Sequence, residues 1–139
     1  MVPVPRSRPA LGLTLVELVI ALAVLGILAS AAWPQYADSV RRGRRADAVQ
    51  AAARVQQAQE AWLGNQLRYS DRLADLGLAA ASPGGHYTLA LSGASATAYT
   101  LTVSAASGKP QAADAGCTVL TVSVLRGQAS FAPAACWSR

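Results

Sequence analysis

Few side chains in this sequence could form a catalytic or metal site: they are two cysteines, one histidine and a carboxylate inside an apolar stretch. Cys117 and Cys136 form the one possible cysteine pair, and His86 is the lone imidazole. No histidine accompanies the cysteines as a zinc site would require, no nucleophile is spaced around His86 as a signature, and the glycines form no phosphate loop. The sequence therefore predicts no catalytic residue, no metal and no cofactor, and it argues against an enzyme.

The carboxylate is Glu17, near the start of the apolar segment 12–36, GLTLVELVIALAVLGILASAAWPQY. A charged group in hydrocarbon costs on the order of 3 kcal/mol unless it has a partner. As a helix, residues 13–33 would be roughly 30 Å long, which suits a membrane anchor, while 29–32 (ASAA) suits signal cleavage. Cleavage before the apolar stretch would instead create a free α-amine that could pair with Glu17 of a neighbouring subunit. Alternatively, Glu17 could snorkel to the headgroups from the end of the helix. Physical chemistry alone leaves these interpretations open.

The same segment resembles the N-terminal motif of type IV pilins, in which a basic leader and a glycine precede Thr-Leu-x-Glu. The matching positions in this sequence are Gly12, Thr14, Leu15 and Glu17. The resemblance implies that prepilin peptidase cuts between Gly12 and Leu13, and that Leu13 becomes the N-methylated terminus, where most members have phenylalanine. It also implies that Glu17 meets the terminal amine of another pilin subunit in a filament.

The resemblance divides the first half of the chain into three parts. Residues 1–12 would be the cleaved leader, 13–35 the membrane-spanning and filament-core helix, and 36–66 an amphipathic helix. Gly26 and Pro34 weaken the first helix, so a kink or loss of helicity is expected there. The apolar face of the second helix is predicted from positions at helical spacing, namely Ala48, Ala51, Ala52, Val55, Ala58 and Trp62.

Residues 67–139 are predicted to form a loop and an antiparallel sheet. Alternating apolar residues indicate strands at 86–91 and 99–103, and richness in valine and threonine indicates a third at 117–125. Arg126 and Gly127 offer a turn into 128–131, and these strands are too few for a sandwich. The fold class is therefore α+β, a long N-terminal helix packed on a small β-meander, which the pilin resemblance also implies. Cys117 and Cys136 fall where the family has its C-terminal disulfide loop, and a disulfide there is expected.

The formal charge of +5 raises the question of an anionic partner. Four arginines at 41–45 could contact lipid headgroups or DNA phosphates, but no aromatic residues interleave them, and a solvated juxtamembrane collar is the simpler interpretation. Lys109, Arg126 and Arg139 are too few and dispersed for a DNA stripe. The sequence thus argues against nucleic acid as a partner.

The sequence predicts a minor pilin of a type IV pilus, most similar to the PilE-type minor pilins in residues 41–50. Its expected role is structural, in pilus biogenesis, adhesion or twitching motility, with other pilin subunits and prepilin peptidase as partners. The alternatives are a DNA-binding competence pilin and a type II secretion pseudopilin. The subunit would wait in the inner membrane with its C-terminal part in the periplasm, although the arginines at 41–45 would favour the opposite orientation.

Overall fold

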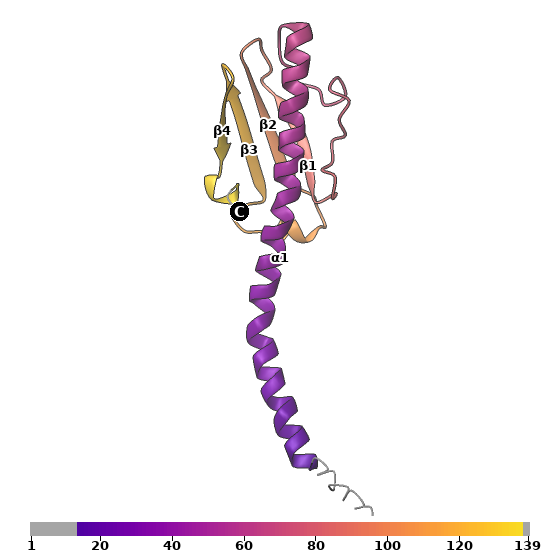
Figure 1. The fold of residues 1–139 in the computed structure, drawn as a ribbon, viewed down its shortest axis with the longest axis vertical. Coiled ribbons are helices and arrows are strands. Elements are labelled where there is room, and N and C mark those ends of the chain that lie inside the picture. The colour runs from indigo at the N-terminus through magenta and orange to yellow at the C-terminus, as the bar shows by residue number, and fades with distance from the viewer. Residues whose placement is uncertain (1–13, 138–139) are drawn as a thin grey trace, which may run out of the picture. The chain divides into compact units, whose positions relative to one another are not determined.

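One long helix begins the described part of the chain, and a four-stranded sheet follows it (Figure 1). The structure is a computed structural model that describes residues 14–137. Helix α1 spans Leu15–Gln66 without interruption. The described residues up to Tyr36 form one unit, and those from Ala37 onward form a second, compact unit. The predicted α+β class, with a long N-terminal helix and an antiparallel sheet, is confirmed.

The sheet is a meander in which sequential strands are neighbours throughout. Its strands are β1 (Tyr87–Ser92), β2 (Ala98–Ala105), β3 (Val119–Leu125) and β4 (Gln128–Ala132), all paired antiparallel. Two 3-10 turns, η1 (Pro110–Ala113) and η2 (Ala134–Cys136), lie before β3 and after β4. The ends of each strand lie within two residues of those of the range predicted from the sequence.

The core lies between the second half of α1 and one face of the sheet. The helix contributes small side chains, among them Ala48 and Ala52, which are at most 1% exposed. The sheet contributes large ones, led by Tyr87, Leu101 and Val122, each fully buried in the same cluster. Burying each large side chain stabilises the fold by about 1.5–3 kcal/mol. Small helix residues let the helix lie close to the sheet, so the sheet's large residues fill the space between them.

Gln59 departs from the predicted apolar face of the helix, because its polar side chain is fully buried while Trp62 is only half-buried. Its amide nitrogen donates to the Ser70 carbonyl oxygen at 2.6 Å, and its amide oxygen accepts the Ser70 backbone N–H at 2.9 Å. The Gln59 side chain therefore forms hydrogen bonds with both the backbone N–H and the carbonyl of Ser70, where the chain reverses after α1. A search for apolar periodicity cannot find such a residue.

The first part of α1 keeps its apolar side chains exposed within its own unit, from Leu15 at 78% to Leu28 at 61%. By length and composition this helix is suited to crossing a membrane. The helix continues through Gly26 and Pro34. The expected loss of helicity at those two residues stays a prediction for the assembled filament.

Candidate functional site

The beginning of α1 carries the pilin-like motif, and its described part starts at Thr14. The Thr14 hydroxyl oxygen accepts the backbone N–H of Glu17 at 3.2 Å, which satisfies one of the donors that a helix start leaves unpaired. Glu17 lies in the first turn, where its negative charge is favoured by the helix dipole. Gly12 and Leu13 lie outside the described residues, so cleavage and methylation there stay predictions.

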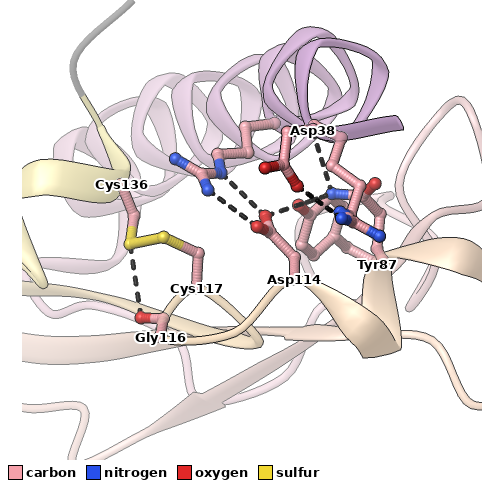
Figure 2. Close-up of polar contacts among 9 residues, drawn as sticks. Asp38, Tyr87, Asp114, Gly116, Cys117 and Cys136 are labelled. Carbon is pink, nitrogen blue, oxygen red and sulfur yellow. Dashed lines mark hydrogen bonds and ion pairs between the residues drawn. A yellow bond between two sulfur atoms is a disulfide. The ribbon is translucent and has the colours of Figure 1, made fainter. Parts of the chain in front are cut away.

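A buried polar network ties the segment between β2 and β3 to α1 (Figure 2). Arg45 donates from Nε and from a terminal nitrogen to the two oxygens of Asp114, both at 2.7 Å. The side-chain nitrogen of Gln111, which is fully buried, donates to the Tyr87 hydroxyl at 2.8 Å and to the Arg41 carbonyl at 3.2 Å. The hydrogen bonds to Asp114 raise the pKa of Arg45, and burial raises the pKa of Tyr87. The network fixes the backbone of α1 where its arginines are clustered.

The four arginines at 41–45 differ in their partners. Arg41 forms an ion pair with Asp38, and this pairing lowers the pKa of the Asp38 carboxyl. Arg45 is held by Asp114, whereas Arg42 and Arg44 form no ion pair among residues 14–137. Of the four arginines in the predicted juxtamembrane collar, two are therefore paired with carboxylates and two are not.

A disulfide joins Cys117 to Cys136, with the Cα atoms 5.7 Å apart. It fastens the described C-terminal end to the beginning of β3. Beside it, the rings of Phe131 and Trp137 meet edge to face, with their centroids 5.1 Å apart. The expected cysteine pairing is thus present in the structure, where it closes β4 and η2 against β3.

A second basic region lies at the end of the sheet where α1 terminates. We call it the helix-end surface and define it as Arg68, the loop 93–97 and Arg126. Two backbone hydrogen bonds bring these segments together: Tyr69 donates to Ser95 at 2.8 Å, and Arg126 donates to Thr97 at 2.7 Å. Figure 1 shows the end of α1 and the turn between β3 and β4 at the same end of this unit.

Both arginine side chains of the helix-end surface are exposed, and neither forms an ion pair among the residues that the structure describes. Arg126 and Gly127 form the two-residue turn between β3 and β4, with φ of 51° and 77°. Such turns favour asparagine or glycine, and a left-handed backbone costs an arginine about 1 kcal/mol. A strained arginine at a hairpin tip is consistent with a role for its side chain.

The carboxylates near this surface are few. Asp71 and Asp75 line a cavity of about 250 Å³ together with Arg68. Both carboxylates are exposed: Asp75 accepts a hydrogen bond from the Ser70 hydroxyl at 3.0 Å, whereas Asp71 forms no side-chain hydrogen bond or ion pair among the described residues. The helix-end surface therefore presents two exposed guanidinium groups beside two exposed carboxylates, of which only Asp71 lacks a hydrogen-bond partner among the described residues, and its unpaired arginines can bind phosphate groups.

Comparison with known proteins decides the family. A family model described as the type IV minor pilin ComP, DNA uptake sequence receptor, matches residues 34–121. The chain belongs to this family of type IV minor pilins. This pilin also matches the prokaryotic N-terminal methylation motif over residues 7–33. The two matches meet near the boundary between the two structural units, and they confirm that the chain is a pilin subunit rather than an enzyme.

The type IV major pilin protein PilA of Myxococcus xanthus (strain DK1622) is 35% identical to this pilin over 75 residues. The match takes in 54% of this chain and 33% of that protein, so it spans a third of the relative's length. It supports the pilin assignment at the level of the family.

The expectation that nucleic acid is not a partner is wrong, because the family that matches over 34–121 is described as a DNA uptake sequence receptor. That expectation counted Lys109, Arg126 and Arg139 as dispersed charges and overlooked Arg68. Lys109 lies beside η1, away from the turn that holds Arg126, and Arg139 lies outside the described residues. No periodic pattern in the sequence relates Arg68 to Arg126. The two residues come together through backbone hydrogen bonds from the loop 93–97, which a local pattern cannot reveal.

Proposed function

We propose that this minor pilin is a DNA receptor for DNA uptake, and that it contacts DNA phosphates through the helix-end surface. The observation that carries the proposal is the family match over 34–121, which includes α1 from Pro34 to its end, all of β1 and β2, and the first three residues of β3. The arrangement of Arg68 and Arg126 supports it, since exposed arginines without ion pairs supply most of the affinity for phosphate backbones.

The loop 93–97 supports the same assignment. Its sequence, GASAT, has only small side chains, and four of its five residues are exposed. Ser95 holds the loop in shape, since its hydroxyl oxygen accepts the backbone N–H groups of Thr97 and Ala98 at 3.2 and 2.9 Å. A duplex can approach such a loop closely, which brings its phosphates within reach of both arginines.

The N-terminal segment supports the rest of the proposal, that the subunit is processed and assembled as pilins are. In this account prepilin peptidase cuts after Gly12, Leu13 is methylated, and Glu17 pairs with the terminal amine of a neighbouring subunit. The exposed apolar side chains of 15–33 would be covered by the inner membrane and later by other subunits. The helix-end surface, far along the chain from that segment, stays open to DNA outside the cell.

The finer resemblance to PilE-type minor pilins carries less weight. It rests on residues 41–50 and on Cys136-Trp137 near the C-terminus, whereas the match to the DNA receptor family extends over 34–121. A purely structural minor pilin and a secretion pseudopilin would both lack affinity for DNA, so binding separates them from the proposed receptor.

The test is fluorescence anisotropy with a labelled DNA duplex and the soluble fragment 37–139. This fragment contains the whole buried core and the disulfide, so it is expected to fold without the first 36 residues. We expect salt-dependent binding that falls on substitution of Arg68→Gln with Arg126→Gln, and the slope of log affinity against log salt should decrease by about 2. Asp71→Asn should raise the affinity, because it removes an opposing carboxylate.

The matched control is Arg54→Gln, which removes an exposed arginine from the middle of α1. Equal losses for the control and for either helix-end arginine would contradict the proposed surface. Absence of salt-dependent binding by the folded fragment would contradict the proposed function. Competition between duplexes from the cell's own genome and scrambled duplexes tests whether a particular sequence is recognised.

A further inference from the structure

The arginines at the other end of the second unit form a separate site. Arg41, Arg42 and Arg45 line a cavity of about 400 Å³ with Asp38, Asp114 and two alanines. We call it the arginine cavity. Three guanidinium groups and two carboxylates line it, so its formal net charge is that of one cation.

Both carboxylates of the arginine cavity already have partners. Asp38 is paired with Arg41, and Asp114 is held by two hydrogen bonds from Arg45. Arg42 is exposed and forms no ion pair within the described chain. The excess positive charge therefore belongs to Arg42, with the unused N–H groups of the other two arginines beside it.

The cavity is built on a fixed backbone. Gln111 donates to the Arg41 carbonyl oxygen, and the Arg45–Asp114 pair anchors the helix one turn later (Figure 2). The stretch of helix that carries the three arginines is therefore fixed to the fold before any ligand arrives. A single phosphodiester, with one negative charge, would neutralise the excess charge of the cavity.

The position of the cavity along the chain indicates which phosphate it meets. Residues 18–37 carry no charged side chain, and at helical rise they extend about 30 Å, the thickness of a bilayer's hydrocarbon core. Trp33 and Tyr36 lie near the end of this stretch, as interfacial aromatics do. Arg41 follows Ala37 by about 6 Å of helix, which is the depth of a headgroup layer.

We infer that the arginine cavity binds the phosphate of an anionic phospholipid headgroup, such as phosphatidylglycerol, while the subunit waits in the membrane before assembly. The inference rests on the proposed function, in which 15–36 is membrane-inserted. In this account the arginines follow the membrane span on its periplasmic side, where the positive-inside rule disfavours basic residues. Bound lipid phosphates would compensate the positive charge of the arginines there. DNA is the less suitable ligand, because a duplex would have to lie against the membrane surface.

The test is co-sedimentation of the fragment 37–139 with vesicles of phosphatidylcholine, with and without phosphatidylglycerol. We expect binding only to the vesicles that contain phosphatidylglycerol, and a loss of about fivefold in partition for Arg42→Gln. Asp38→Asn should increase binding, since it removes a competing carboxylate from an exposed position. Arg54→Gln is the control of equal charge outside the cavity, and it should change the partition much less.

Equal losses for the Arg42 and Arg54 variants would overturn the inference, because attraction would then depend on net charge alone. Lack of binding to phosphatidylglycerol vesicles by the folded fragment would also overturn it. Loss of duplex affinity in the Arg42 variant without loss of vesicle binding would assign the cavity to DNA. The proposed receptor function is tested separately, by the duplex affinity of the Arg68 and Arg126 variants.

Discussion

The side-chain amide of Gln59 brackets Ser70, accepting its backbone N–H at 2.9 Å and donating to its carbonyl oxygen at 2.6 Å. Both groups are shielded from water by the chain that reverses after α1. This contact fixes the segment that carries Arg68, two residues before Ser70. A buried residue of the core thereby determines the position of one arginine of the helix-end surface.

Replacing Gln59 by leucine should lower the free energy of unfolding of the fragment 37–139 by about 2–4 kcal/mol. The substitution leaves two backbone groups of Ser70 buried without partners, and each costs about 1–3 kcal/mol. Urea denaturation followed by circular dichroism measures the change. Gln57→Leu, at an exposed position of the same helix, is the control, and an equal effect there would contradict the assigned role of Gln59.

Breaking the Arg45–Asp114 pair by Asp114→Ala should destabilise the same fragment by about 3 kcal/mol, because Arg45 would remain largely buried without its counter-charge. Asp38→Ala should cost much less, since the ion pair between Asp38 and Arg41 is exposed and screened by water. The two unfolding curves check this difference. Similar losses for both variants would show that the buried network does not anchor the segment between β2 and β3.

Reducing the disulfide, or replacing Cys117 and Cys136 by serine, should lower stability by about 3 kcal/mol. The link closes a loop with a sequence separation of 19, and loops of that length contribute about this much by restricting the unfolded chain. Thermal unfolding with and without reductant measures the effect. An unchanged midpoint would mean that the C-terminal segment is held by packing alone.

The contribution of Tyr99 to the stability of the fragment should be fully present below pH 10 and should be lost between about pH 10 and 12. Burial raises the pKa of Tyr99 to about 12 from its ordinary value of 10.0. The folded state thus favours the protonated phenol, and its advantage disappears as pH rises through the folded pKa. Tyr99→Phe should flatten part of this fall in urea denaturation series. Burial also raises the pKa of Tyr69, so part of the fall remains in that variant.

Glu17→Ala should leave the subunit cleaved and membrane-inserted but absent from filaments, because the terminal amine of its neighbour would lack a counter-charge. Immunoblots of sheared pili and of membranes measure both fractions. Glu60→Ala, in the second half of α1, is the control and should assemble. Normal incorporation of the Glu17 variant would contradict the proposed assembly pairing.

The sequence predicts β1, β2 and β3 well because their apolar residues alternate with polar ones and are buried on one face, whereas β4 is exposed along its length and is predicted from the turn at Arg126 and Gly127. Tyr87 and Leu89 of β1, for example, are buried on the predicted face. It does not predict the polar contacts between distant segments. Gln59 is polar at a core position, and the Arg45–Asp114 pair joins residues that no local pattern relates.

The helix-end surface escaped prediction for the same reason. Arg68 follows α1 and Arg126 occupies a hairpin tip, and the two come together only through the backbone bonds of the loop 93–97. Counting basic residues along the chain therefore missed this pair of arginines. The apolar segment and Glu17 were recognisable because their pattern is local.

DNA uptake by intact cells tests the central claim most directly. Cells whose sole copy of this pilin carries Arg68→Gln and Arg126→Gln would be compared with cells carrying Arg54→Gln, with pili counted in both. The account predicts that both strains assemble the subunit normally and that the double variant takes up far less labelled DNA. Uptake that is equal in the two strains, with equal pilus numbers, would contradict the assignment of this surface as the DNA receptor.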